Sequence, residues 1–148
     1  MKIYFAHGKE SGPWGSKIKR LADIAKGLGC AVESIDYQDL PDSPDLRVER
    51  LLDTLKNETG RFILVGSSMG GYVSLVASGQ VKADGVFLLA PALNIPSYQH
   101  QSYPTNNQHL EIVHGWSDDI IPPENSIRFA KEADCTLHLL SGAHRLNT

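Results

Sequence analysis

Short apolar segments alternate along this chain with longer segments in which apolar residues recur every three or four positions. Several of the short segments are apolar at consecutive positions, which is typical of strands covered on both faces of a sheet. We expect strands over residues 2–6, 31–35, 61–65, 85–90, 110–114 and 136–140.

The longer segments have the spacing of amphipathic helices. Prolines favour the opening of two of them, and a glycine favours the end of a third. Helices are expected over residues 16–28, over a segment opened by Ser43-Pro44 and reaching Leu55, over 69–79 and over 122–133. Residues 91–108 are rich in proline, asparagine, glutamine and tyrosine, and we interpret them as a loop.

Strands that alternate with helices predict an α/β fold, with a mainly parallel six-stranded sheet and helices on both faces. No repeat or linker interrupts the pattern, so we interpret residues 1–148 as a single domain. In such sheets, ligands bind outside the carboxyl ends of the strands. Functional residues are therefore expected directly after strands.

Composition and charge exclude several classes of protein. The 148 residues carry a net charge of −3, so we expect no nucleic-acid partner. One basic cluster, formed by Lys17, Lys19 and Arg20, is spaced to lie on the solvent-exposed side of a helix. The longest uncharged apolar run, 86–95, is far too short for a membrane span.

The apolar run at the start of the chain is too short for a signal peptide. Cys30 and Cys135 lie far apart and form neither a metal motif nor a disulfide framework. We therefore expect a cytoplasmic protein.

The stretch Gly66-Ser67-Ser68-Met69-Gly70 matches G-x-S-x-G, the nucleophile elbow that joins a strand to a helix. The turn raises the Ser68 hydroxyl above the sheet. Neighbouring backbone passes so close that the positions two before and two after the serine, Gly66 and Gly70, must be small. A glycine-rich structural turn is the alternative interpretation. The apolar strand before the motif and the amphipathic helix after it favour the nucleophile.

A nucleophilic serine needs a histidine base and an acid that orients the base. His144 follows the last predicted strand, whereas His138 lies inside that strand and His114 is interpreted as structural support. Among the acids between Ser68 and His144, only Asp118 and Asp119 follow a strand at its carboxyl end. The residues alone leave the choice between these two aspartates open.

The chain resembles the α/β-hydrolase superfamily, and within it the small, nearly lidless bacterial esterase-like serine hydrolases. The segments that carry the resemblance are "FAHGKESGP", "GSSMGG", "APAL", "HGWSDDIIP" and "SGAHRL". The register of the acid loop in that family selects Asp118 over Asp119. The resemblance also implies the strand order 2-1-3-4-5-6 and an oxyanion hole made by the backbone N–H groups of Met69 and Lys9.

The resemblance implies cleavage of an ester-type acyl bond in a small-molecule substrate through an acyl-enzyme intermediate. We expect this mechanism to need no metal and no organic cofactor. Trp14, Trp116 and Tyr98 are candidates for the substrate pocket. A thioesterase or acyltransferase with the same triad is an alternative, and so is a binding module with little turnover. The sequence selects neither a substrate nor an acyl-chain length.

Family members carry one more helix after the catalytic histidine, whereas this sequence stops four residues after His144. Without that helix, one apolar face of the third to sixth strands would lack cover. We expect either that the natural chain continues beyond Thr148 or that a second copy of the chain covers this face as a homodimer.

Overall fold

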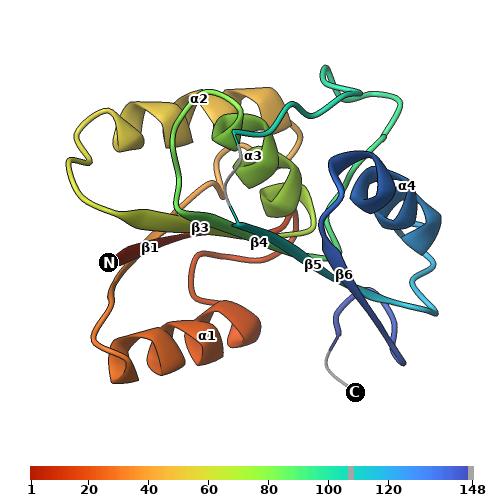
Figure 1. Cartoon of the computed structure of the whole chain (residues 1–148), viewed down its shortest axis with the longest axis horizontal. Coiled ribbons are helices and arrows are strands. Elements are labelled where there is room, and N and C mark those ends of the chain that lie inside the picture. The colour runs from red at the N-terminus through yellow and green to blue at the C-terminus, as the bar shows by residue number, and fades with distance from the viewer. Residues whose placement is uncertain (107–108, 147–148) are drawn as a thin grey trace.

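The computed structural model describes residues 1–106 and 109–146, and within them the chain forms six strands and four helices (Figure 1). The elements are β1 (Lys2–Ala6), α1 (Ser16–Gly27), β2 (Ala31–Ile35), α2 (Pro44–Leu55), β3 (Phe62–Ser67), α3 (Met69–Ser78), β4 (Gly85–Leu89), β5 (His109–Gly115), α4 (Pro123–Ala133) and β6 (Thr136–Leu140). Each expected element is present, with ends shifted by only a few residues.

The strands are all parallel in the order β2-β1-β3-β4-β5-β6, as expected. In Figure 1, α1 lies on one face of the sheet, while α2, α3 and α4 lie on the other. The carboxyl ends of all six strands within the described residues therefore point to one edge, where the loops after β1, β3, β5 and β6 meet.

The larger part of the core lies between the sheet and the helices α2, α3 and α4. Every residue of α3 is buried, because this helix crosses the centre of the sheet and packs on both β3 and β4. A smaller cluster on the other face joins Ile18 and Ala22 of α1 to Phe5 and Val65 of the sheet. Sheet and helices thus hold the loops at the carboxyl edge in place.

The sheet face that carries α1 becomes polar towards β6. Phe5, Val65, Phe87, Glu111 and Thr136 are in register across five strands, so they lie in one row on this face. The first two are buried near α1, Phe87 is half-buried, and Glu111 accepts hydrogen bonds from histidines of β5 and β6. Val113 of β5 and Leu140 of β6 also lie on this face, and Leu140 is exposed. The face that we expected to be apolar over the third to sixth strands is therefore mixed towards β6.

The described residues that follow β6, 141–146, contain no helix. None of the helices within the described part of the chain is long and apolar enough to cross a membrane.

Candidate active site

Ser68 lies at the sharp turn between β3 and α3, where the G-x-S-x-G motif places it. Its φ of 56° and ψ of −119° are unusual for a residue with a side chain, and such strain is common at functional sites. A Cβ atom on Gly70 would collide with the carbonyl of Ala6. The glycine is therefore required by the close approach of β1, and the Ser68 side chain is raised at the carboxyl edge of the sheet.

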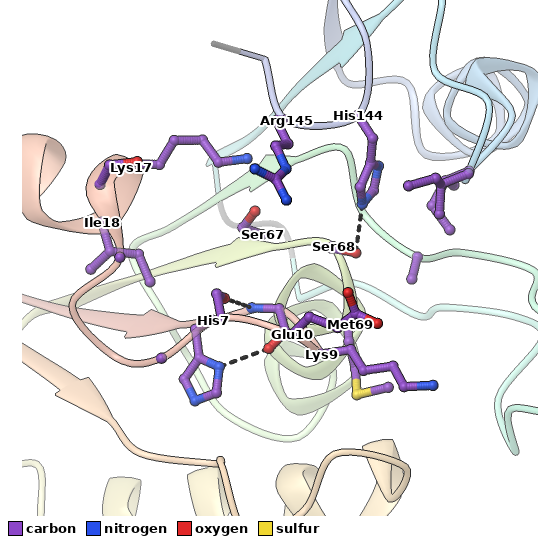
Figure 2. Close-up of a pocket in the computed structure, with 18 of the residues that line it drawn as sticks. His7, Lys9, Glu10, Lys17, Ile18, Ser67, Ser68, Met69, His144 and Arg145 are labelled. Atoms are coloured by element: carbon purple, nitrogen blue, oxygen red, sulfur yellow. Dashed lines mark hydrogen bonds between the residues drawn. The ribbon is translucent and has the colours of Figure 1, made fainter.

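His144 reaches Ser68 from the loop after β6. Its Nε2 atom lies 2.9 Å from Ser68 Oγ, and its Nδ1 atom lies 2.7 Å from Asp118 Oδ2 (Figure 2 shows the first contact). These partners fit the tautomer in which Nδ1–H donates to the carboxylate and Nε2 accepts from the hydroxyl. The structure thus brings the three sequence-predicted residues into one chain of hydrogen bonds.

Asp118 is buried and fully engaged. Its Oδ1 atom accepts hydrogen bonds from the backbone N–H groups of Ile120 at 2.9 Å and Ile121 at 2.8 Å. Burial by itself raises the pKa of this carboxyl, but the hydrogen bonds from His144 and the two amides outweigh burial and hold the pKa below its usual value. The neighbouring Asp119 is exposed.

His114 contacts Asp118 from strand β5. It is fully buried at the end of β5, and its Nε2 atom lies 3.1 Å from Asp118 Oδ2 and 2.9 Å from the carbonyl oxygen of Ile121. Its Nδ1 atom is 2.7 Å from Ser126 Oγ of α4. One ring nitrogen therefore contacts the loop that carries Asp118 and the other contacts helix α4, which agrees with the supporting role expected for this residue.

The loop after β1 passes directly beside the serine. A Cβ atom on Gly8 would lie 3.4 Å from Ser68 Cβ, and the next residue, Lys9, lines the same cavity as the serine. Met69 is the first residue of α3, and its N–H has no acceptor within the helix. The Lys9 side chain points outwards and pairs with Asp42 at 2.8 Å, which leaves only the Lys9 backbone for the site.

Arg47 anchors this loop, and sequence reasoning missed it. It is fully buried on α2, where its Nη1 atom donates to the carbonyl oxygens of His7 at 2.9 Å and Gly8 at 3.4 Å. The sequence held a signal, because Arg47 lies three residues after Pro44 and four before Leu51, on the buried stripe of the helix.

A cavity of about 650 Å³ opens at the serine, which is an ordinary size for a small-molecule site. Tyr98 lines it, as predicted. Trp14 and Trp116 are not among the described residues that line the cavity, and their side chains are 49% and 59% exposed. Apolar lining comes instead from residues that the prediction did not include: Ile18, Ile95, Ile120 and Ile121.

The basic cluster of α1 does not lie wholly on the solvent side. Lys19 and Arg20 are exposed, as expected, but Lys17 is half-buried and lines the cavity. The expectation was wrong for Lys17 because the first turn of α1 faces the loop after β6, which the helical period of α1 cannot reveal. Arg145 from that loop lines the same cavity.

In residues 1–106 and 109–146, no group of three or more His, Cys, Asp or Glu side chains is arranged to hold a metal ion.

Comparison with known sequences matches residues 1–112 to the model of a family described as an uncharacterised protein family, UPF0227. The chain is also 35% identical over 79 residues to acyl-protein thioesterase 1 from Emericella nidulans. That match covers 49% of this chain and 33% of the thioesterase, so it spans about a third of the length of that curated relative.

Solved structures share the whole fold. A candidate hydrolase of the alpha/beta superfamily from Xanthomonas campestris pv. campestris superposes with a TM-score of 0.89 and 33% identity, covering 99% of this chain and 89% of that one. Alpha/beta hydrolase domain-containing protein 10 from mouse superposes with a TM-score of 0.79 at 20% identity, covering 99% and 83%. Est1E from Butyrivibrio proteoclasticus gives 0.80 at 17% identity, covering 99% and 81%.

The family model covers most of the chain, and the sheet order and helix placement agree with the fold of these hydrolases. The protein is therefore a member of the UPF0227 family with the fold of the α/β-hydrolase superfamily.

Proposed function

We propose that the protein is a serine hydrolase that cleaves an ester-type acyl bond in a small-molecule substrate, with Ser68, His144 and Asp118 as the catalytic triad. One observation carries the proposal: hydrogen bonds of 2.9 Å and 2.7 Å link Ser68 to His144 and His144 to Asp118 beside a substrate-sized cavity. A histidine with a purely structural role would not require a strained serine, a buried acid and an open cavity beside it.

In this proposal, Ser68 Oγ attacks the acyl carbonyl while its proton passes to His144 Nε2. The imidazolium then donates that proton to the leaving alcohol as the carbon–oxygen bond breaks, which leaves an acyl group on Ser68. Water repeats the sequence through His144, releases the acid and restores the hydroxyl. Asp118 holds the Nδ1–H tautomer and offsets the charge that the imidazole gains.

The oxyanion of each tetrahedral intermediate would bind the N–H groups of Met69 and Lys9. Supporting this, Met69 begins α3, where the helix dipole favours negative charge, and the Lys9 loop passes beside Ser68. Arg47 would hold the His7–Gly8 carbonyls so that the following N–H group faces the intermediate.

A thioester substrate is the second candidate, favoured by the similarity of half the chain to acyl-protein thioesterase 1. The same triad would serve both bonds, because the leaving group alone differs. Hydrolysis of matched oxygen and sulfur esters of one acyl chain separates the two, and the substrate with the higher kcat/KM identifies the preferred bond.

Labelling by a fluorophosphonate probe tests the proposed function. The wild-type protein is expected to be labelled, and Ser68→Ala is expected to lose labelling and to lose kcat by about 10⁶-fold. Ser67→Ala is the matched control, because it removes the neighbouring hydroxyl at the last residue of β3. This variant should retain labelling. Absence of labelling in the wild-type protein would favour a binding module. Loss of labelling in Ser67→Ala, with labelling retained in Ser68→Ala, would assign the nucleophile to Ser67.

A further inference from the structure

Two cations line the cavity on the same side of the serine. Lys17 comes from the first turn of α1, and Arg145 directly follows His144. Figure 2 shows their side chains extending towards each other near Ser67, with the Lys17 ammonium beside the Arg145 guanidinium in this view. Their charges act on one another, because Arg145 contributes to a shift in the pKa of Lys17.

Among the residues that the structure describes, none serves as a dedicated counter-charge for this pair. Burial and then the charge of Arg145 lower the pKa of Lys17, and only Asp118 acts in the opposite direction. Both Asp118 oxygens are already engaged, by His144 and by the amides of residues 120 and 121. Within the described part of the chain, neither Lys17 nor Arg145 forms an ion pair, whereas Lys9 at the same cavity pairs with Asp42.

This arrangement is costly unless a ligand completes it. Two like charges in a partly dehydrated cavity repel each other and lose hydration. The protein as a whole carries 17 acidic and 14 basic side chains, yet no carboxylate in residues 1–106 and 109–146 forms an ion pair with either cation. Glu10, which also lines the cavity, acts on Lys9 and lies below Ser68 in Figure 2, away from the cation pair.

We propose that Lys17 and Arg145 form an anion subsite, so that the substrate carries a carboxylate or phosphate in addition to the bond that is cleaved. This inference rests on the proposed hydrolase function for the reaction, but not for the binding of the anion. Arg145 offers a planar fork of donors that matches a carboxylate or phosphate, and Lys17 adds a compact charge. The anion is held here while the acyl carbonyl lies at Ser68.

Two ester pairs test the preference and locate the anion. Monophenyl glutarate against phenyl pentanoate places the carboxylate on the acyl side, and 4-(butyryloxy)benzoate against phenyl butyrate places it on the alcohol side. In at least one pair, kcat/KM for the anionic ester should exceed that for the neutral ester after subtraction of the spontaneous rate. High salt should reduce this preference, since it screens charges at a solvent-accessible site.

Variants connect the preference to the two cations. Lys17→Met and Arg145→Gln should each lower the anionic-to-neutral ratio of kcat/KM by about tenfold, the usual effect of one charged hydrogen bond. Lys19→Met removes the same charge from an exposed position of α1 and should leave the ratio unchanged. Equal ratios in the wild-type protein, Lys17→Met and Lys19→Met would overturn the anion subsite.

Binding separates a failure of this inference from a failure of the proposed function. Titration of monophenyl glutarate and 4-(butyryloxy)benzoate into Ser68→Ala, monitored by calorimetry, requires no turnover. Binding that weakens about tenfold in the double variants Ser68→Ala/Lys17→Met and Ser68→Ala/Arg145→Gln supports the subsite even if no ester is hydrolysed. Binding of both esters that is indifferent to Lys17 and Arg145 contradicts it, even if the esterase activity is present.

Discussion

At the scale of single residues, the arrangement of Ser68, His144 and Asp118 depends on hydrogen bonds that engage both ends of each of the last two side chains. Asp118 accepts two backbone hydrogen bonds on one oxygen and contacts two histidines with the other. His144 uses one ring nitrogen for the acid and the other for the serine. Such engagement fixes orientation, because any rotation would leave a buried group unpaired.

The choice between the adjacent aspartates is testable. Asp118→Asn should lower kcat by about 10⁴-fold, because an amide favours the wrong histidine tautomer. Asp119→Asn should have little effect, since Asp119 is exposed. Steady-state kinetics on one ester distinguishes the two variants. A larger loss of kcat in Asp119→Asn than in Asp118→Asn would show that Asp119 is the acid of the triad.

Arg47 is a positioning residue, and it too can be tested. Arg47→Met would leave the carbonyl oxygens of His7 and Leu40 without their side-chain donor, at a cost of about 2–4 kcal/mol in the free energy of unfolding. The Gly8 carbonyl oxygen would keep its 2.7 Å contact with His7 Nδ1. We expect kcat to fall more than KM changes, because the Lys9 amide would shift away from the oxyanion.

Arg50→Met is the control on the same helix. Arg50 is paired with Asp39 at the surface, and such pairs contribute at most about 1 kcal/mol. Urea unfolding measures the free energy of unfolding of both variants, and steady-state kinetics measures their kcat and KM. An Arg47→Met protein with unchanged kcat would show that the loop holds its position without this side chain.

At the scale of elements, the β3–α3 unit decides where the nucleophile lies. The helix is buried at every residue, and its start is pressed against neighbouring backbone. Besides Gly70, Gly71 approaches Pro91 so closely that an added Cβ would lie 2.7 Å from the Pro91 Cβ. The elbow is thus held between β1 and the loop after β4, which explains why a strained serine persists there.

A single methyl group should disturb this unit. Gly70→Ala would force α3 away from the Ala6 carbonyl and should lower both the unfolding midpoint and the probe labelling of Ser68. Gly27→Ala is the matched control, because an added Cβ there meets nothing within 4 Å at the end of α1. Thermal unfolding compares Gly70→Ala with Gly27→Ala. Equal midpoints would show that the backbone around Ser68 accommodates the added methyl group.

At the scale of the whole molecule, the parallel sheet brings distant segments to one edge. Ser68 and His144 are separated by 76 positions in the sequence, yet their side chains are in hydrogen-bond contact. The loop after β1 and the loop after β5 complete the same edge. The site therefore exists only when the sheet is assembled, and its ionisation is linked to the stability of the fold.

This linkage predicts how stability depends on pH. The pKa of Asp118 is lower in the folded protein than its ordinary value, so its ionised form contributes stability above the unfolded pKa, near 3.9. That contribution is lost as pH falls through the folded pKa. The difference in unfolding free energy between wild type and Asp118→Asn should therefore shrink below about pH 4.

Urea unfolding at several pH values from 7 to 3 measures this difference. Asp119→Asn provides the reference for removing an exposed carboxylate. A difference for Asp118→Asn that stays constant or grows on acidification would mean that the Asp118 carboxyl is not stabilised in its charged form.

The sequence by itself determined the order and type of the elements, and with them the edge where functional residues gather. Apolar period distinguishes strand from helix because it reports which side of an element faces the core. The parallel sheet and the positions of Ser68, Asp118 and His144 after strands follow from this local information, whereas the strand order came from the family resemblance. The catalytic roles of the three residues stay a prediction.

Only the tertiary structure decided which side chains from distant loops meet. It brought Lys17 and Arg145 to the same cavity, buried Arg47 against the loop after β1, and left Trp14 and Trp116 outside the cavity lining. It also decided that Glu111 lies on the sheet face that carries α1. The physical reason is that a periodic pattern specifies a direction relative to one element, while a contact depends on how two elements are packed.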